Sequence, residues 1–250
     1  MDLSQLGGLA PMLALGAAAF AAGGLVKGTL GVGLPMVTVP LLALVMPSPQ
    51  AISLVAAPVL VSNVWQAWDS GGAPNIWKRF SFMLVPLFVV TLLTVPLTLA
   101  MSPRVLNIML AGALLTAVLL IGFRPTLAIA PRQEAAASFV VGALSGVLGA
   151  VSSLMGPIII SYLMALRLPR EEFIGSISIM YLVTAVPLYG SMAWYGKLGL
   201  AELAFSVLAM LPMFAGMVIG KRLRGHLNED WFRRGLLAFL VVVAGLLVFK

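Results

Sequence analysis

Residues 23–35 read GGLVKGTLGVGLP, and this stretch decides how the rest of the chain is interpreted. Five glycines, one lysine and one proline lie here between two apolar runs. Glycine lets the backbone leave a helix, and proline removes a hydrogen-bond donor and begins the next helix well. Inside a bilayer, such a break is tolerated only where protein or a water-filled cavity surrounds the freed backbone. In a membrane protein, the stretch therefore predicts a broken or re-entrant helix.

The composition identifies the chain as a membrane protein. Of its 250 residues, 61% are hydrophobic and 9% are charged, whereas about 25% are charged in an average soluble domain. The mean hydropathy is +1.10. A soluble fold of this size could not cover so much apolar surface, because most of its charge would have to lie on a wetted exterior. We therefore expect an all-α integral membrane protein.

Charges and turn residues divide the chain into about ten apolar segments. They cover residues 9–26, 29–46, 50–68, 80–101, 105–122, 135–149, 152–167, 172–192, 200–220 and 231–249. A full span needs about 20 apolar residues. Three segments, 29–46, 135–149 and 152–167, are short and interrupted by glycine or proline, so we expect them to be broken or re-entrant.

The first half of the chain also resembles the second half in sequence. A shift of 122 residues places Gly24 on Gly146, Pro35 on Pro157 and Pro47 on Pro169, and 10 of the 41 positions from Gly24 to Val64 are then identical. Shared apolar composition is the alternative explanation. We interpret the halves as repeats, residues 1–122 and 123–250. Each half has an odd number of segments, so the second half would enter from the opposite side, as inverted repeats of secondary transporters do.

Basic residues predict the orientation. With the amino terminus outside, twelve lysines and arginines fall on the inner side of the membrane. Only Arg104, Lys197 and Lys250 then fall outside. Because short cytoplasmic loops are enriched in lysine and arginine, we expect both termini outside the cytoplasm of a multi-pass protein in the bacterial inner membrane.

The first broken segment has the chemistry of an anion site. Lys27 supplies a charge that costs about 2.5–3.5 kcal/mol at mid-bilayer on insertion scales, so a lysine there usually has a function. Open backbone N–H groups at a helix break also attract anions, which makes Gly28, Thr29, Gly31 and Gly33 candidates. Two alternatives stay open: Lys27 orients the chain from a cytoplasmic loop, and the glycines pack helices closely.

The second broken segment, residues 142–157, reads GALSGVLGAVSSLMGP. Gly149 falls where Lys27 stood, and Ser152 and Ser153 offer hydroxyls instead of charge. With Gly156 these serines are candidates for the hydroxyl side of a small pocket whose cationic side is Lys27. Alternatively, the serines bond back to carbonyls of their own helix.

Polar side chains also follow each break. Those behind the first are Ser62, Asn63 and Gln66, and those behind the second are Ser176, Ser178 and Thr184. Amides and hydroxyls inside a bundle bind substrate or join helices. We favour the joining role, with Asn63 as the exception that we place among the substrate-binding candidates.

Several functions are excluded by missing residues. No Asp or Glu lies near the middle of an apolar segment, which disfavours a cation pump or a divalent-metal carrier. The chain has no Walker A loop, no His-Glu-x-x-His motif and no catalytic set, and it has no cysteine. No basic tail exists to bind nucleic acid. We predict no enzyme, no metal and no cofactor.

The chain resembles the sulfite exporter TauE/SafE family of bacterial inner-membrane permeases. The resemblance covers almost the whole chain and rests on its size, the internal repeat, and the Gly-rich stretches Gly24 to Pro35 and Gly142 to Pro157 with the later prolines Pro47 and Pro169. It implies a secondary transporter, favouring export, of sulfur-containing anions such as sulfite or organosulfonates.

Two other functions remain open on the sequence: a scaffold or assembly subunit that transports nothing, and a permease for a neutral or zwitterionic solute. The expected partners are a small anionic substrate and membrane lipid. The coupling ion is not identified, and a homo-oligomer stays open.

Overall fold

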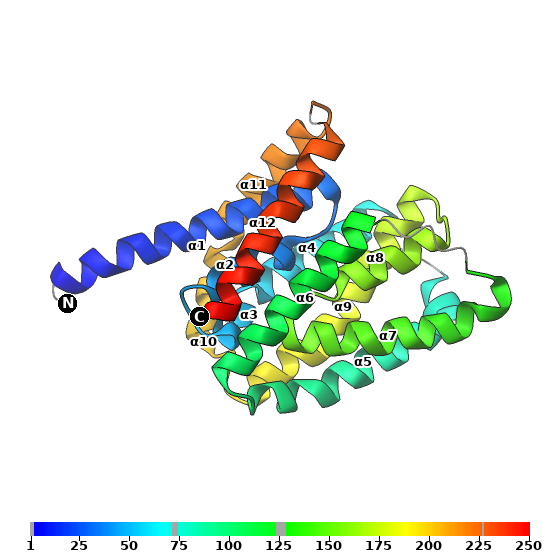
Figure 1. Cartoon of the computed structure of the whole chain (residues 1–250), viewed down its shortest axis with the longest axis horizontal. Helices are drawn as coiled ribbons and strands as arrows, with labels where there is room; N and C mark the ends of the chain where they lie inside the picture. Colours follow the sequence, from blue (N-terminus) through cyan, green and yellow to red (C-terminus); the bar gives the residue numbers. More distant parts are fainter. Residues whose placement is uncertain (1–2, 72–74, 124–128, 227) are drawn as a thin grey trace.

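The computed structural model describes residues 3–71, 75–123, 129–226 and 228–250, which form helices joined by short turns (Figure 1). In chain order the α-helices are α1 (Leu3–Leu30), α2 (Leu34–Ala43), α3 (Ser48–Leu54), α4 (Ala56–Asp69), α5 (Ile76–Leu99), α6 (Pro103–Phe123), α7 (Glu134–Ser152), α8 (Gly156–Ala165), α9 (Arg170–Trp194), α10 (Leu200–Leu208), α11 (Met210–Leu223) and α12 (Glu229–Phe249). One short 3-10 helix, η1 (Pro131–Gln133), precedes α7. The predicted all-α class is confirmed over these residues.

Seven stretches of the described chain are long and apolar enough to cross a membrane. They are Pro11–Leu30, Ile76–Leu99, Pro103–Phe123, Glu134–Ser152, Glu171–Trp194, Leu200–Leu223 and Asp230–Phe249. Helices α3 and α4, bent by 41° at their junction, would together make an eighth span. Large apolar side chains such as Leu93, Val186 and Leu211 face outward, where lipid would cover them. The chain is therefore a multi-pass membrane protein.

Of the three segments expected to be short, two form short helices and one does not. Helices α2 and α8 have ten residues each, about 15 Å of helix, which is half the thickness of a hydrocarbon core. The expectation for 135–149 was wrong, because this segment lies within the 19-residue helix α7, which is long enough to span. Its glycines pack against a neighbouring helix and do not interrupt it.

Two breaks separate the long helices from the short ones. The first break, Gly31–Gly33, follows α1, and the second break, Ser153–Met155, follows α7. Each long helix is left through a residue with positive φ, Gly31 at 83° and Ser153 at 59°, and each short helix has proline in its first turn. A left-handed residue ends a helix because its backbone turns away from the helical path.

The boundaries of the helices repeat along the chain. Helix α1 ends at Leu30 and α7 at Ser152, α2 begins at Leu34 and α8 at Gly156, and α3 begins at Ser48 and α9 at Arg170. Each pair differs by 122 residues, which is the shift found in the sequence.

Glycines allow the closest helix contacts. On α1, a Cβ at Gly24 or Gly28 would clash with the carbonyls of Met213 or Met217 on α11. On α7, a Cβ at Gly142 would clash with the carbonyl of Met83 on α5. Small residues at such contacts let backbones approach and pack by dispersion inside a membrane. The helix-packing role of Gly28 is thus realised in the structure.

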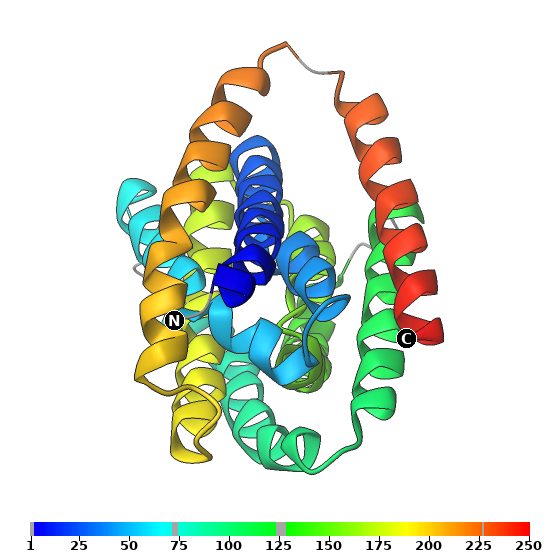
Figure 2. The ribbon, with the colours of Figure 1, turned by 90° about the vertical axis from the view of Figure 1, so that its left-hand side faces the viewer.

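The largest helix contacts join one half of the chain to the other. Helix α1 packs on α11 of the second half, and α7 packs on α5 of the first half. Helices α4 and α9 pack on each other, as do α6 and α12. Figure 2 shows α1, α2 and α3 between α10–α11 on one side and α6–α12 on the other.

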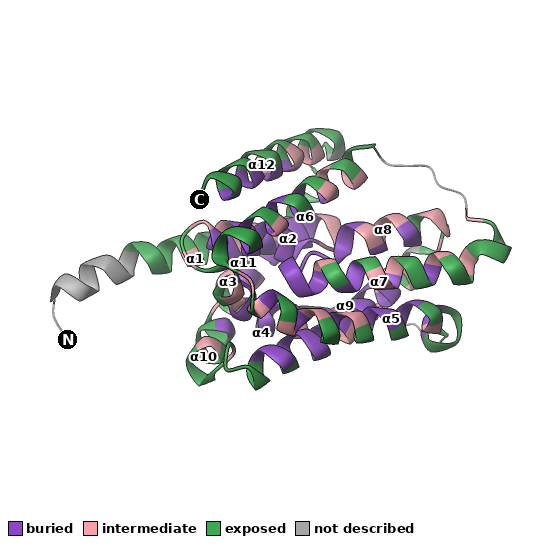
Figure 3. Ribbon diagram, turned by 60° about the horizontal axis from the view of Figure 1, so that its bottom comes forward, coloured by how far each residue is buried: buried purple, intermediate pink, exposed green. Residues whose placement is uncertain are grey.

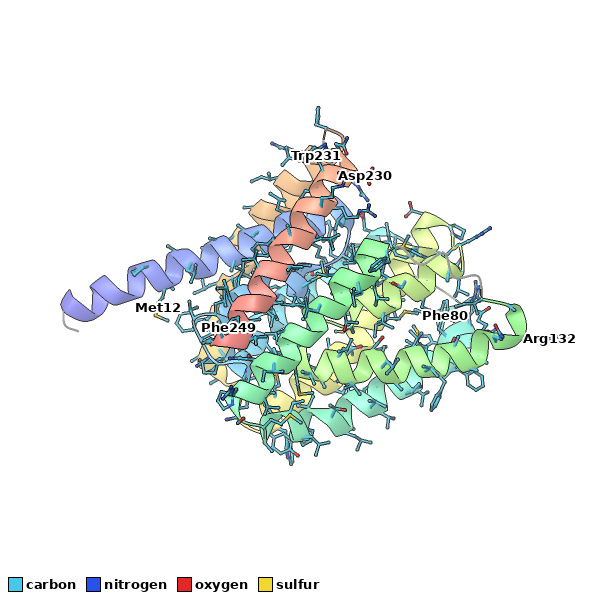
Figure 4. All side chains as sticks on the ribbon, in the orientation of Figure 1. Met12, Phe80, Arg132, Asp230, Trp231 and Phe249 are labelled. Atoms are coloured by element: carbon cyan, nitrogen blue, oxygen red, sulfur yellow. The ribbon has the colours of Figure 1, made fainter. Side chains whose placement is uncertain are left out.

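Burial follows this arrangement. In Figure 3, α2 and the inner faces of α4 and α9 are buried, whereas the outer faces of α12 and of the other long helices are exposed. The early part of α1 projects beyond the other helices, and Met12 lies on it with 55% of its surface exposed (Figure 4). The residues of the two breaks are buried or partly buried inside these exposed outer faces.

Candidate functional site

Lys27 lies in the last turn of α1 and is buried, with 4% of its surface exposed. Its Nζ donates a hydrogen bond of 3.1 Å to Oδ1 of Asn63 on α4. The amide nitrogen of Asn63 in turn donates to the carbonyl of Val59, at 2.8 Å, which fixes the orientation of the amide. The alternative that placed Lys27 in a cytoplasmic loop is wrong, because the residue is helical and enclosed.

A second amide of α4 holds the first break itself. Gln66, three residues after Asn63, donates from Nε2 to the carbonyl of Gly31 at 2.8 Å. Residues three apart lie on one face of a helix, so the same face of α4 binds both Lys27 and Gly31. Sequence reasoning named Gln66 as a residue that joins helices, and the structure confirms that role. For Asn63, the structure shows a helix-joining contact that involves the candidate lysine.

The other candidates of the first half lie around this pair. Gly28 and Thr29 belong to α1, and the hydroxyl of Thr29 bonds back to the carbonyls of Leu25 and Val26 at 3.0 and 2.9 Å. Gly31 and Gly33 form the break, each with positive φ, 83° and 99°. Gly33 caps the start of α2, where the first backbone N–H groups have no helical partner.

The second break is also buried but has different polar groups. The hydroxyl of Ser152 bonds back to the carbonyl of Leu148 at 2.7 Å, as the alternative for the serines predicted. Ser153 is fully buried, and its hydroxyl has no hydrogen-bond partner among the described residues. Gly156 begins α8 directly against the hydroxyl of Tyr181, which leaves no room for a Cβ.

Tyr189 on α9 is a buried residue of this site that the sequence reasoning missed. It is 5% exposed, and its hydroxyl faces Ser153 without reaching the geometry of a hydrogen bond. The available signal was a phenol within the apolar segment 172–192.

Most other hydroxyls behind the breaks bond to their own helices. Ser62, Ser178 and Thr184 donate to the carbonyls of Val59, Ile174 and Met180. The hydroxyl of Ser176 has no partner among the described residues. These four side chains therefore do not join helices.

The two breaks share apolar packing. Val32 of the first break packs against the cluster formed by α5, α8 and α9, which contains Met155 of the second break. Leu154 of the second break belongs to the cluster that contains Val26 and Leu34 around the first. Among the described residues, no hydrogen bond joins Lys27 to Ser152, Ser153 or Gly156, so the two breaks meet through apolar contacts.

Two cavities lie between the helices of the described chain. One cavity of about 10 Å³ lies beside the end of α7, lined in part by Ala150, Val151 and Leu188. It is about the size of one water molecule. A larger groove of about 550 Å³ lies between α5 and α9, but its lining, from Trp77 to Val186, is apolar. The first cavity, which Ser48 and Thr98 also line, is too small for an anion, and the second has an apolar lining.

The sequence has no Asp or Glu between residues 3 and 68 or between 135 and 170, the stretches that contain the two breaks. Arg79 pairs with Glu134 and Glu172 at 3.0 and 3.5 Å and joins the starts of α5, α7 and α9. No group of three or more His, Cys, Asp or Glu side chains within the described ranges could hold a metal ion.

A multi-pass bundle whose interrupted helices surround buried polar groups is typical of a membrane transporter. The chain matches the model of the family described as sulfite exporter TauE/SafE over residues 15–247, and it belongs to that family. It is thus a membrane transporter and not an enzyme, as predicted. Neither a curated protein nor a solved structure matches the chain significantly.

Proposed function

We propose that this protein is a secondary transporter of a small sulfur-containing anion, such as sulfite or an organosulfonate, and that it exports this anion across the bacterial inner membrane. The observation that carries the proposal is the buried amino group of Lys27, whose partner in the described structure is a neutral amide. The family description supports the sulfur chemistry.

The charge of Lys27 is the reason to expect an anion. Burying a charge without an opposite charge is costly, and the Asn63 amide supplies one hydrogen bond but no charge. An ammonium has three donors, so two are left after Asn63 for the oxygens of a ligand. An oxyanion would supply both the missing charge and acceptors.

The remaining candidates would complete the site around this charge. Gly33 offers a backbone N–H group just before α2, Gly156 offers one at the start of α8, and Ser153 offers its hydroxyl at the second break. The N–H of Gly31 and the hydroxyl of Ser152 donate to the carbonyls of Lys27 and Leu148 in this conformation, so each would have to leave that carbonyl to bind the anion. Gly28 and Thr29 shape the last turn of α1, where Gly28 lets α11 approach. The site would assemble when the two breaks move together, which the shared apolar clusters permit.

We further propose that residues 1–122 and 123–250 are inverted repeats. Helix α1 runs parallel to α11, since Gly24 meets Met213 and Gly28 meets Met217. Helix α7 runs parallel to α5, since Gly142 meets Met83 and Gly146 meets Leu87.

Because α1 is parallel to α11 and α7 is parallel to α5, the relative directions of α11 and α5 give those of α1 and α7. Arg79 joins the starts of α5 and α9, and α10–α11 turns back after α9 across residues 195–199. Helices α5 and α11 are then antiparallel, so α1 and α7 run in opposite directions, which is visible in Figure 1. Opposed repeats would expose the site to each side in turn.

The distribution of basic residues supports an orientation with both termini outside the cytoplasm. Because the cytoplasm is electrically negative, passive movement of an anion favours export.

The test is a thermal-stability screen of the purified protein with sulfite, sulfate, thiosulfate, sulfoacetate and taurine, and with carboxylates and neutral solutes for comparison. A bound anion at about 100 times its Kd adds about 2.7 kcal/mol to the free energy of unfolding. We expect a sulfur oxyanion to stabilise the protein, Lys27→Gln to lose this response, and Lys221→Gln, which removes an exposed lysine, to keep it.

The same screen separates the two alternatives. A scaffold, which the glycine packing of α1 on α11 would suit, would respond to none of these solutes. A carrier of a neutral or zwitterionic solute would respond to taurine or a neutral compound, and Lys27→Gln would preserve that response.

A further inference from the structure

The carboxyl-terminal ends of α1 and α7 occupy equivalent positions but differ in charge. The end of a helix carries a partial negative charge and carbonyls without helical partners. At the end of α1, the ammonium of Lys27 lies within the last turn and Gln66 donates to the carbonyl of Gly31. This helix end therefore has its own cation and its own donor.

The end of α7 has neither group. At the 122-residue shift, Gly149 replaces Lys27, Ala185 replaces Asn63 and Leu188 replaces Gln66. What the second break has instead are two buried hydroxyl oxygens, Oγ of Ser153 and Oη of Tyr189. Neither has a hydrogen-bond partner among the described residues, although both residues are more than nine-tenths buried.

Four buried hydroxyls have no partner among the described residues, those of Ser145, Ser153, Ser176 and Tyr189, and Ser153 and Tyr189 are the two that face each other. Ser161, Ser178 and Thr184, on α8 and α9, satisfy their hydroxyls by donating to carbonyls of their own helices at 2.8–2.9 Å. Ser153 cannot follow this pattern, because its left-handed backbone lies beyond the helix. An unpaired buried hydroxyl costs free energy. A cation coordinated by the lone pairs of its oxygen would offset part of this cost.

We propose that the second break is a binding site for Na⁺, held by Ser153 Oγ, Tyr189 Oη and the free carbonyls at the end of α7. In this site the exchangeable ion takes the place that the ammonium of Lys27 has at the end of α1. Ends of broken helices and unwound carbonyls are the groups that coordinate Na⁺ in secondary transporters.

The ligand set selects a monovalent cation. All of its members are neutral oxygens, and the sequence has no Asp or Glu between residues 135 and 170, around Ser153, or between 173 and 201, around Tyr189. A divalent ion would need carboxylates to offset its charge. The role of this Na⁺ as a coupling ion rests on the proposed transport of an anion, whereas its binding does not.

The experiment measures Na⁺ binding by the purified full-length protein in the absence of substrate. Melting temperatures are recorded in sodium, potassium or N-methyl-D-glucamine gluconate at one total concentration, and binding of radioactive ²²Na⁺ is measured directly. We expect Na⁺, at about 100 times its Kd, to raise the melting temperature by about 5 °C or more, and the two other cations to leave it unchanged.

Variants locate the site. We expect Ser153→Gly and Tyr189→Phe each to weaken Na⁺ affinity at least about tenfold. Ser178→Ala and Tyr195→Phe are the matched controls, because Ser178 is bonded to its own helix and Tyr195 is half exposed, and both should bind Na⁺ like the original chain. If Tyr189→Phe does not fold, Ser153→Gly decides alone, since glycine suits the left-handed backbone there.

Equal responses to Na⁺ and K⁺, or unchanged Na⁺ affinity in both site variants, would overturn the proposal. Lys27→Gln separates it from the proposed function, because this variant should lose the anion response and keep the Na⁺ response. Absence of Na⁺ binding alongside an intact anion response removes only the Na⁺ site. Na⁺ binding without any anion response removes only the anion transport.

Discussion

The first and second breaks have a similar backbone and different polar chemistry. Both follow a long helix through a left-handed residue and both precede a ten-residue helix with proline in its first turn. At the first break, the buried polar groups are paired: Lys27 with Asn63, and Gln66 with Gly31. At the second break, Ser153 and Tyr189 have no partner among the described residues.

The difference shows that the same backbone break can lie beside a fixed charge in one half of the chain and beside neutral hydroxyl oxygens in the other. The shape of each break depends on glycine, proline and a left-handed residue, which tolerate many neighbours. Its chemistry depends on a few side chains from α4 or α9.

Removing the fixed charge should have the largest effect. We expect Lys27→Gln to weaken anion recognition by about 2–5 kcal/mol, the usual result of removing a buried, hydrogen-bonded charge. The measurement is kcat/KM for anion efflux from proteoliposomes, with Lys221→Gln as the control. Unchanged efflux in Lys27→Gln would show that the first break does not bind the substrate.

Overpacking the glycine contacts should affect both halves alike. Gly24→Ala and Gly142→Ala each place a Cβ against a backbone carbonyl of the facing helix, and each should lower the free energy of unfolding by about 1–3 kcal/mol. Gly112 on α6 has open space around it, so Gly112→Ala should be neutral or gain up to about 1 kcal/mol. A loss at only one of the two contacts would count against equivalent roles for α1 and α7.

Removing the donor of Gln66 should loosen only the first break. Gln66→Met leaves the carbonyl of Gly31 without its partner, at a cost of about 0.5–1.5 kcal/mol. We expect faster amide hydrogen exchange around residues 31–36 and unchanged exchange around 153–158. Equal acceleration at both breaks would mean that they open as one unit.

Exchanging residue types between the breaks should have the smallest effects, with opposite signs. In Na⁺-free buffer, Ser153→Gly should raise the free energy of unfolding by about 0.5–1 kcal/mol, because glycine adopts positive φ without strain. Gly31→Ser should lower it by about 1 kcal/mol for the same reason. Denaturation curves of the two variants test this, and changes of the same sign would contradict the shared backbone role.

Much of the architecture could be predicted from local signals. The apolar segments and the glycine and proline positions indicated most of the helices and both breaks, because helix ends depend on nearby residues. The segment 135–149 was misread because its glycines resemble those of a break. The contacts of Gly142 and Gly146 with the facing helix α5, which the sequence does not reveal, show that these glycines serve helix packing.

The sequence by itself determined that this chain is a helical membrane protein with two similar interrupted regions, since hydropathy and backbone conformation are properties of neighbouring residues. The tertiary structure decided which polar groups are paired. Lys27 and Asn63 are 36 residues apart. Ser153, which follows α7, faces Tyr189 of α9. Such contacts depend on how helices pack across the chain, and no local pattern specifies which side chain meets which.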